Sequence, residues 1–168
     1  PCEDFAKIPD TKVADIVFTA LPHKASMAVV PHLLQLDHRV VDLSADFRFK
    51  DAGTYEKWYG AHTAKDLLPI AVYGLPEIYA DDIKNASLVG NPGCYPTSAL
   101  LPLLPLIGED FVDPDNIVAD AKSGTSGAGR SPLLATNFCE VNEAFRAYKV
   151  DEHRHTPEME EVLTMFSG

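Results

Sequence analysis

Short apolar runs alternate with helical patterns along this chain, and that alternation limits the folds open to it. Four runs rich in apolar and β-branched residues predict buried strands, at residues 14–20, 38–44, 71–78 and 86–90. Between the first two, residues 21–37 carry apolar side chains at helical spacing, namely Met27, Val30, Leu33 and Leu34. Strands that alternate with helices are typical of βαβ units. The sequence therefore predicts an α/β fold built on a parallel sheet.

The remaining segments predict a less regular continuation. Residues 45–60 predict a loop and a short helix, 97–108 a helix, 116–124 a strand and 156–166 a last helix. Thr156 suits the cap of that last helix and Pro157 its first position. A change of composition near residues 90–96 places a domain boundary there, which divides the chain into 1–93 and 94–168.

Three prolines lie inside the expected helices. Pro31 should start, kink or break the first of them, because proline lacks the N–H that a helix interior needs. Pro102 and Pro105 should interrupt the helix at 97–108.

Charge and cysteine content exclude several classes of function. The chain has 25 acidic and 14 basic residues and a net charge of −11, which argues against binding nucleic acid or an anionic membrane. Its three cysteines are odd in number and widely spaced, which suits a reducing compartment and shows no metal-site spacing. With no leader-like or membrane-spanning stretch, the expectation is a soluble, cytoplasmic protein.

The ends of the chain predict an internal piece of a larger protein. A dinucleotide-binding fold normally opens with a strand, a Gly-rich turn and a helix, and no GxGxxG turn is present. Without that turn we expect weak binding of a dinucleotide by this chain alone.

Cys94 stands where a loop should turn into a helix. Gly93 allows a tight turn just before the thiol, and Pro96 suits a first helical turn. Free N–H groups at a helix start favour the thiolate, which is the nucleophilic form. The alternative is a small buried hydrophobic residue, and that is the interpretation of Cys2 and Cys139.

Two histidines offer a proton acceptor. His153 and His155 occupy alternate positions just before the last expected helix, so both imidazoles can face one site while Arg154 turns away. Surface or capping histidines are an equal alternative, and a metal pair is a weaker one because no third ligand is visible.

Residues 122–130 form a Gly-rich loop flanked by Lys122 and Arg130. Backbone N–H groups in such a loop, with a guanidinium nearby, can hold a phosphate or carboxylate. An ordinary tight turn is the alternative.

Three motifs occur together in one order, GNPGCYPT (90–97), KSGTSGAGR (122–130) and HRHTPE (153–158). With ALPHKAS, VVDLSADFR and EVNEAFRAY they resemble the N-acetyl-gamma-glutamyl-phosphate reductases, which are related to aspartate-semialdehyde dehydrogenases. The resemblance runs from about residue 14 to residue 163. It implies part of a Rossmann-type sheet followed by the start of an α/β catalytic and dimerisation domain of the semialdehyde-dehydrogenase type.

The resemblance also implies chemistry. It implies reduction of an acyl phosphate, the small-molecule substrate, by NADPH through a thioester on Cys94, with His153 as acid/base partner and His155 beside it. NADPH rather than NADH rests on the resemblance alone, and so does a homo-oligomer. No metal is expected.

Further contacts are predicted as two sets. Those for the cofactor are Leu21, Pro22, Ser44, Ala45, Ser126 and Gly127, and those for substrate and phosphate are Asn91, Ser123, Gly124 and Arg130. Pro102 is a small departure within the helix that follows the cysteine. Two alternatives stay open, an aspartate-semialdehyde dehydrogenase type enzyme and a non-catalytic fragment or binding module.

Overall fold

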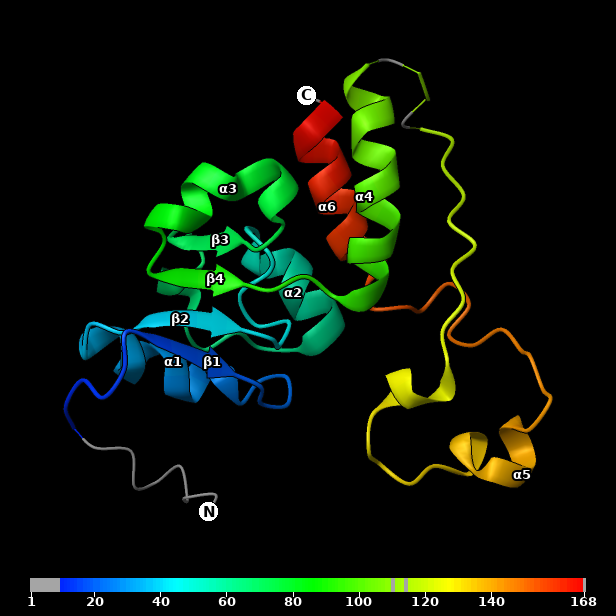
Figure 1. Ribbon diagram of the computed structural model, residues 1–168, viewed down its shortest axis with the longest axis horizontal. Helices are drawn as coiled ribbons and strands as arrows, with labels where there is room; N and C mark the ends of the chain where they lie inside the picture. The colour runs from blue at the N-terminus through cyan, green and yellow to red at the C-terminus, as the bar shows by residue number, and fades with distance from the viewer. Residues whose placement is uncertain (1–9, 110, 114, 168) are drawn as a thin grey trace.

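The computed structural model describes residues 10–109, 111–113 and 115–167. Its centre is a four-stranded parallel sheet in the order β1-β2-β4-β3 (Figure 1). The strands are β1 (Ile16–Thr19), β2 (Arg39–Asp42), β3 (Ala71–Tyr73) and β4 (Leu88–Gly90). All three neighbouring pairs are parallel. The predicted α/β fold is confirmed.

Six α-helices and three short 3-10 turns complete the described residues. The helices are α1 (Ser26–Gln35), α2 (Ala52–Tyr59), α3 (Pro76–Asn85), α4 (Cys94–Gly108), α5 (Phe138–Val141) and α6 (Thr156–Ser167). The 3-10 turns are η2 (Lys65–Leu67), η3 (Thr125–Ala128) and η4 (Leu134–Thr136). None of the described helices is long and apolar enough to cross a membrane.

Two apolar clusters hold these elements together. The larger packs α1 and α2 against the sheet and includes Val30, Leu33, Val40 and Tyr55. The smaller joins β3 to α4 and α6 through Tyr73, Leu75, Leu100, Leu104 and Val162. Full burial of one such side chain contributes roughly 1.5–3 kcal/mol. In Figure 1, α4 and α6 therefore stand side by side beyond the carboxyl ends of the strands.

The strand predicted at 71–78 is correct only for its first three residues. Leu75 precedes a helix, and Pro76 takes the first position of α3, where its missing N–H costs nothing. The start of α3 is hidden in the sequence, because apolar residues continue through Leu75 to Ile78.

The strand predicted at 116–124 is wrong. Residues 117–124 form no regular structure, and Val118 is 93% exposed. A β-pattern becomes a strand only where a neighbouring strand supplies hydrogen bonds, and within the described ranges this segment has no such neighbour. Figure 1 shows it as an extended path outside the sheet.

The prolines do not interrupt the helices. Pro102 and Pro105 lie inside α4, which runs unbroken for 15 residues, and α1 begins at Ser26 with Pro31 in its interior. Each interior proline costs about 3 kcal/mol. Packing of Leu100 and Leu104 against α6 offsets that cost in α4.

Candidate active site

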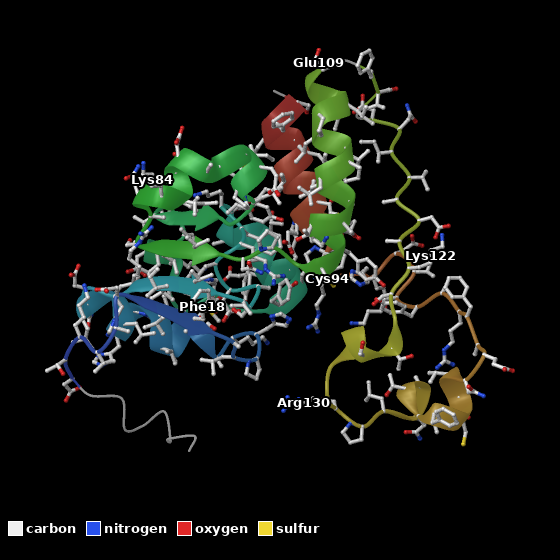
Figure 2. All side chains as sticks on the ribbon, in the orientation of Figure 1. Phe18, Lys84, Cys94, Glu109, Lys122 and Arg130 are labelled. Atoms are coloured by element: carbon white, nitrogen blue, oxygen red, sulfur yellow. The ribbon has the colours of Figure 1, made fainter. Side chains whose placement is uncertain are left out.

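Cys94 is the first residue of α4, and its side chain is exposed. Gly93 is the N-cap of this helix, so the thiol sits beside N–H groups that have no partner within the helix. The predicted position of the cysteine at a helix start is confirmed. In Figure 2, Cys94 lies where the chain leaves the sheet and enters α4.

His155 lies directly against Gly93. A Cβ atom built on Gly93 would come within 2.6 Å of His155 Nε2, so only glycine leaves room for the imidazole here. Burial is the main cause that lowers the pKa of His155 to about 4, and the nearby Arg48, His153 and His23 lower it further. The imidazole is therefore neutral at pH 7, and its Nδ1 is buried without a hydrogen-bond partner among the described residues.

His153 is the second imidazole, with its ring centroid 4.9 Å from that of His155. Its Nδ1 accepts a hydrogen bond from the backbone N–H of His155 at 3.1 Å. In the neutral ring the proton therefore resides on Nε2. Burial lowers the pKa of His153 as well. The structure brings both predicted histidines together beside the helix that carries Cys94.

Two tyrosines that were not predicted from the sequence complete this surface. Tyr148 donates a hydrogen bond to the Tyr95 hydroxyl at 2.8 Å, and its own oxygen lies 3.5 Å from His153 Nε2. The Tyr95 ring is 5.1 Å from His153 and 5.9 Å from His155. Burial, helped by the bond to Tyr95, raises the pKa of Tyr148 to about 12, so its hydroxyl keeps its proton at neutral pH.

A buried ion pair between Arg48 and Glu158 holds the elements of the site together. Arg48 Nη1 lies 3.2 Å from Glu158 Oε2, and both side chains are almost fully buried. Glu158 Oε1 accepts hydrogen bonds from the Tyr73 hydroxyl and from the Gly93 N–H, each at 2.9 Å. The network thus fixes α6, and with it the histidine segment, to the N-cap of α4. Local sequence patterns carry no signal for it, because Arg48 and Glu158 are 110 residues apart.

Asn91 belongs to the same anchor. Its N–H donates to the Asp42 carbonyl at 2.8 Å, and its own carbonyl accepts from Arg48 Nε at 2.7 Å. The Asn91 side chain donates to the Pro92 carbonyl at 3.1 Å. These contacts hold the backbone that leads to Cys94, and the predicted substrate contact of Asn91 stays a prediction.

The structure leaves the Gly-rich loop open to solvent. Residues 123–130, which include the predicted Ser123, Gly124, Ser126, Gly127 and Arg130, are all exposed. A Cβ on Gly127 would meet Ser123 Oγ at 2.6 Å, and Gly129 has a φ of +81°, so glycines here serve a tight turn. In Figure 2, Arg130 lies well away from Cys94.

The other two cysteines of the chain are Cys139 and Cys2. Cys139 is exposed, so its interpretation as a buried hydrophobic residue is wrong, since α5 lies outside both apolar clusters. Cys2 lies outside the described residues. Within residues 10–109, 111–113 and 115–167, no group of three or more His, Cys, Asp or Glu side chains could hold a metal ion.

Two domains of one enzyme family match parts of this chain. Residues 1–86 match the semialdehyde dehydrogenase NAD binding domain, and residues 94–168 match the semialdehyde dehydrogenase dimerisation domain. The chain belongs to the semialdehyde dehydrogenase family.

Curated relatives narrow the comparison within the family. An N-acetyl-gamma-glutamyl-phosphate reductase of Syntrophobacter fumaroxidans is 57% identical over 92% of this chain and 45% of the relative. That of Magnetococcus marinus is 59% identical over 94% of this chain and 45% of the relative, and that of Geobacter metallireducens 53% over 99% and 48%. The chain therefore spans about half the length of the curated relatives it matches.

The match to an NAD binding domain implies a dinucleotide at the carboxyl edge of the sheet. Some of the residues predicted to contact it are accessible there. Pro22 is exposed and Leu21 half-buried, so both can line a ligand at this edge. Ser44 and Ala45 are buried, and the Ser44 hydroxyl is already bonded to Asp42 at 2.5 Å. These two residues can form the wall with their backbone, while their side chains serve the fold.

Proposed function

We propose that this protein is an NADPH-dependent N-acetyl-gamma-glutamyl-phosphate reductase of arginine biosynthesis. It would reduce N-acetyl-L-glutamyl 5-phosphate to N-acetyl-L-glutamate 5-semialdehyde and release phosphate. The observation that carries the proposal is the exposed thiol of Cys94 at the start of α4, beside two neutral imidazoles. The names of the relatives support the substrate, and they favour this activity over that of an aspartate-semialdehyde dehydrogenase.

Cys94 would act as the nucleophile. Its sulfur attacks the acyl carbon, a carbon–sulfur bond forms, and the bond from that carbon to the phosphate oxygen breaks. Phosphate leaves with the electron pair, and a thioester remains on Cys94.

His153 would move the protons. Its Nε2–H is a donor in the neutral ring and lies on the same surface as the thiol. Leu21, Pro22 and the backbone of Ser44 and Ala45 would hold NADPH at the carboxyl edge. There it would supply the hydride that converts the thioester to aldehyde, and the carbon–sulfur bond would break to free the Cys94 thiolate. His153 can protonate the group that leaves or the oxygen that gains charge, and His155 keeps this imidazole in place.

The wider assignment follows from the same proposal. Residues 1–93 would form part of the dinucleotide-binding domain, and residues 94–168 the start of the catalytic and dimerisation domain. The second match supports a homo-oligomer. A cytoplasmic location fits a biosynthetic reductase that uses NADPH.

The test is an NADPH-oxidation assay with N-acetyl-glutamyl phosphate on this chain and on any longer natural form. Cys94→Ser should abolish turnover, whereas Cys139→Ser, which removes another exposed thiol, should leave it unchanged. Faster turnover with aspartyl phosphate would assign the protein to the related dehydrogenases. Turnover that survives Cys94→Ser would refute the thioester route.

A further inference from the structure

Three basic side chains gather at the C-terminal end of α2, and the reaction outlined above does not use them. The Arg154 guanidinium carbon lies 5.4 Å from the centroid of the Tyr59 ring. The His23 ring meets the same tyrosine edge-on, with centroids 5.2 Å apart. Lys24 Nζ lies over Gly60, where a Cβ atom would approach it to 3.2 Å. We call His23, Lys24 and Arg154 the α2 basic cluster.

The backbone around the α2 basic cluster is fixed by hydrogen bonds. Lys24 adopts a left-handed φ of 75°, and its N–H donates to Asp46 Oδ1 at 2.8 Å. His23 Nδ1 accepts from the Ala45 N–H at 3.1 Å, so the neutral ring carries its proton on Nε2. The Arg154 carbonyl accepts from the Tyr59 hydroxyl at 3.4 Å. A left-handed lysine costs strain, and such strain concentrates at binding sites.

The donors of the α2 basic cluster are unused. In the described part of the chain, no carboxylate lies within 4.0 Å of the Lys24 or Arg154 side chain, and neither side chain donates a hydrogen bond. Asp46 accepts from the Lys24 N–H and the Tyr55 hydroxyl through Oδ1, and its Oδ2 is buried without a hydrogen-bond partner among the described residues. Unpaired cations are unexpected in a protein of net charge −11.

Attraction to the end of α2 does not account for all three groups. A helix C-terminus favours a cation only weakly, and only within its last turn. The eight-residue α2 already has Lys57 in that turn. Stacking on Tyr59 also orients the Arg154 guanidinium, which a dipole alone does not do.

We propose that Arg154 and Lys24, with the Nε2–H of His23, bind a phosphate dianion at the carboxyl edge of the sheet. A planar guanidinium held on an aromatic ring gives two parallel N–H donors, and the lysine adds a point charge. Arg154 stands between His153 and His155, and His23 is close enough to lower the pKa of His155. The site therefore adjoins the one built around Cys94.

Which molecule supplies the phosphate depends on the proposed function. The acyl phosphate of the substrate and the phosphates of NADPH present the same chemistry to this cluster. Inorganic phosphate tests that chemistry without turnover, so the binding site and the reductase activity can fail separately.

The experiment is a titration of this chain with inorganic phosphate, followed by phosphorus NMR. Arg154→Ala should weaken binding on the order of 10- to 100-fold, as expected for a lost charge-assisted pair. Arg154→Lys should restore part of it, and Lys24→Ala should weaken it less. The control is Lys84→Ala, which removes one exposed charge at the far end of α3, as Figure 2 shows. Circular dichroism checks that each variant folds.

Two further titrations identify the source. If Arg154→Ala weakens NADPH binding but not NADH binding, the site takes the cofactor 2′-phosphate. If it instead raises the KM for the acyl phosphate, the site takes the substrate phosphate. Wild-type chain that binds no phosphate, or an equal loss in Arg154→Ala and Lys84→Ala, would overturn the proposal.

Discussion

Glu158 on α6 accepts a hydrogen bond from the backbone N–H of Gly93 across 2.9 Å, at the point where α4 begins. The same carboxylate is paired with Arg48, which also donates to the Leu43 and Asn91 carbonyls. One buried ion pair thus joins the loops after β2 and β4 to the helix that follows the two histidines. The geometry of the thiol and the imidazoles depends on it.

Glu158→Gln should therefore destabilise the chain strongly. The substitution leaves the Arg48 charge buried without its partner, and breaking a buried pair in this way costs about 3–5 kcal/mol. Urea unfolding followed by circular dichroism measures the loss. Glu160→Gln on the exposed side of the same helix is the matched control and should change stability by less than about 0.5 kcal/mol.

Gly93→Ala tests the contact between the loop and His155. The new methyl group would meet His155 Nε2 at 2.6 Å, so the imidazole has to move. A displacement of about 1 Å can cost on the order of 10²-fold in rate. We expect a fall in kcat of that order with the acyl phosphate. Gly108→Ala meets only Phe166 at 3.4 Å and should leave kcat near the wild-type value. Equal rates for the two variants would show that His155 is not needed in this position.

The sequence predicted the elements that depend on local pattern. Parallel strands and the cysteine at a helix start follow from apolar periodicity and from Gly93 and Pro96, and both are present. The prediction of a strand at 116–124 is wrong because a strand also needs a neighbouring strand, which can lie far away in the sequence. The Arg48–Glu158 pair could not be predicted for the same reason, since the sequence near each residue does not indicate its partner.

Cys94 and Cys139, both exposed, allow an internal test of the nucleophile. Cys94 begins a 15-residue helix, whereas Cys139 lies within the four-residue α5. Because the residues on either side of Cys94 contact His155 and His153, which can accept the thiol proton, iodoacetamide at neutral pH should label Cys94 first. Peptide mass spectrometry over time measures both rates in one sample. Faster labelling of Cys139 or Cys2 would show that Cys94 is not the reactive thiol of this chain.

The two histidines should differ in their effect on turnover. His153 directs its Nε2–H toward the Tyr148 oxygen at the exposed side of the site, whereas His155 is packed on Gly93 with its Nδ1 enclosed. His153→Asn should lower kcat on the order of 10²–10⁴-fold, as expected for the loss of an acid/base group. His155→Asn should lower it less. The reverse order would assign the proton transfer to His155.

Stability should fall as the pH drops from about 6.5 to about 4. The pKa of His155 is about 4 in the folded chain, mainly because of burial, and the ordinary value for an unfolded histidine is 6.5. Between these values the unfolded chain binds a proton that the folded chain does not, so the free energy of unfolding rises with pH. The contribution is complete above the unfolded pKa and is lost as the pH approaches the folded one. The lowered pKa of His153 acts in the same direction.

The urea concentration at the midpoint of unfolding should therefore increase with pH between about pH 4.5 and about pH 7.5. His155→Gln should flatten that slope, whereas His32→Gln, which changes a half-exposed histidine on α1, should leave it as in the wild type. A wild-type slope that survives His155→Gln would mean that His155 is not the group that the fold holds neutral.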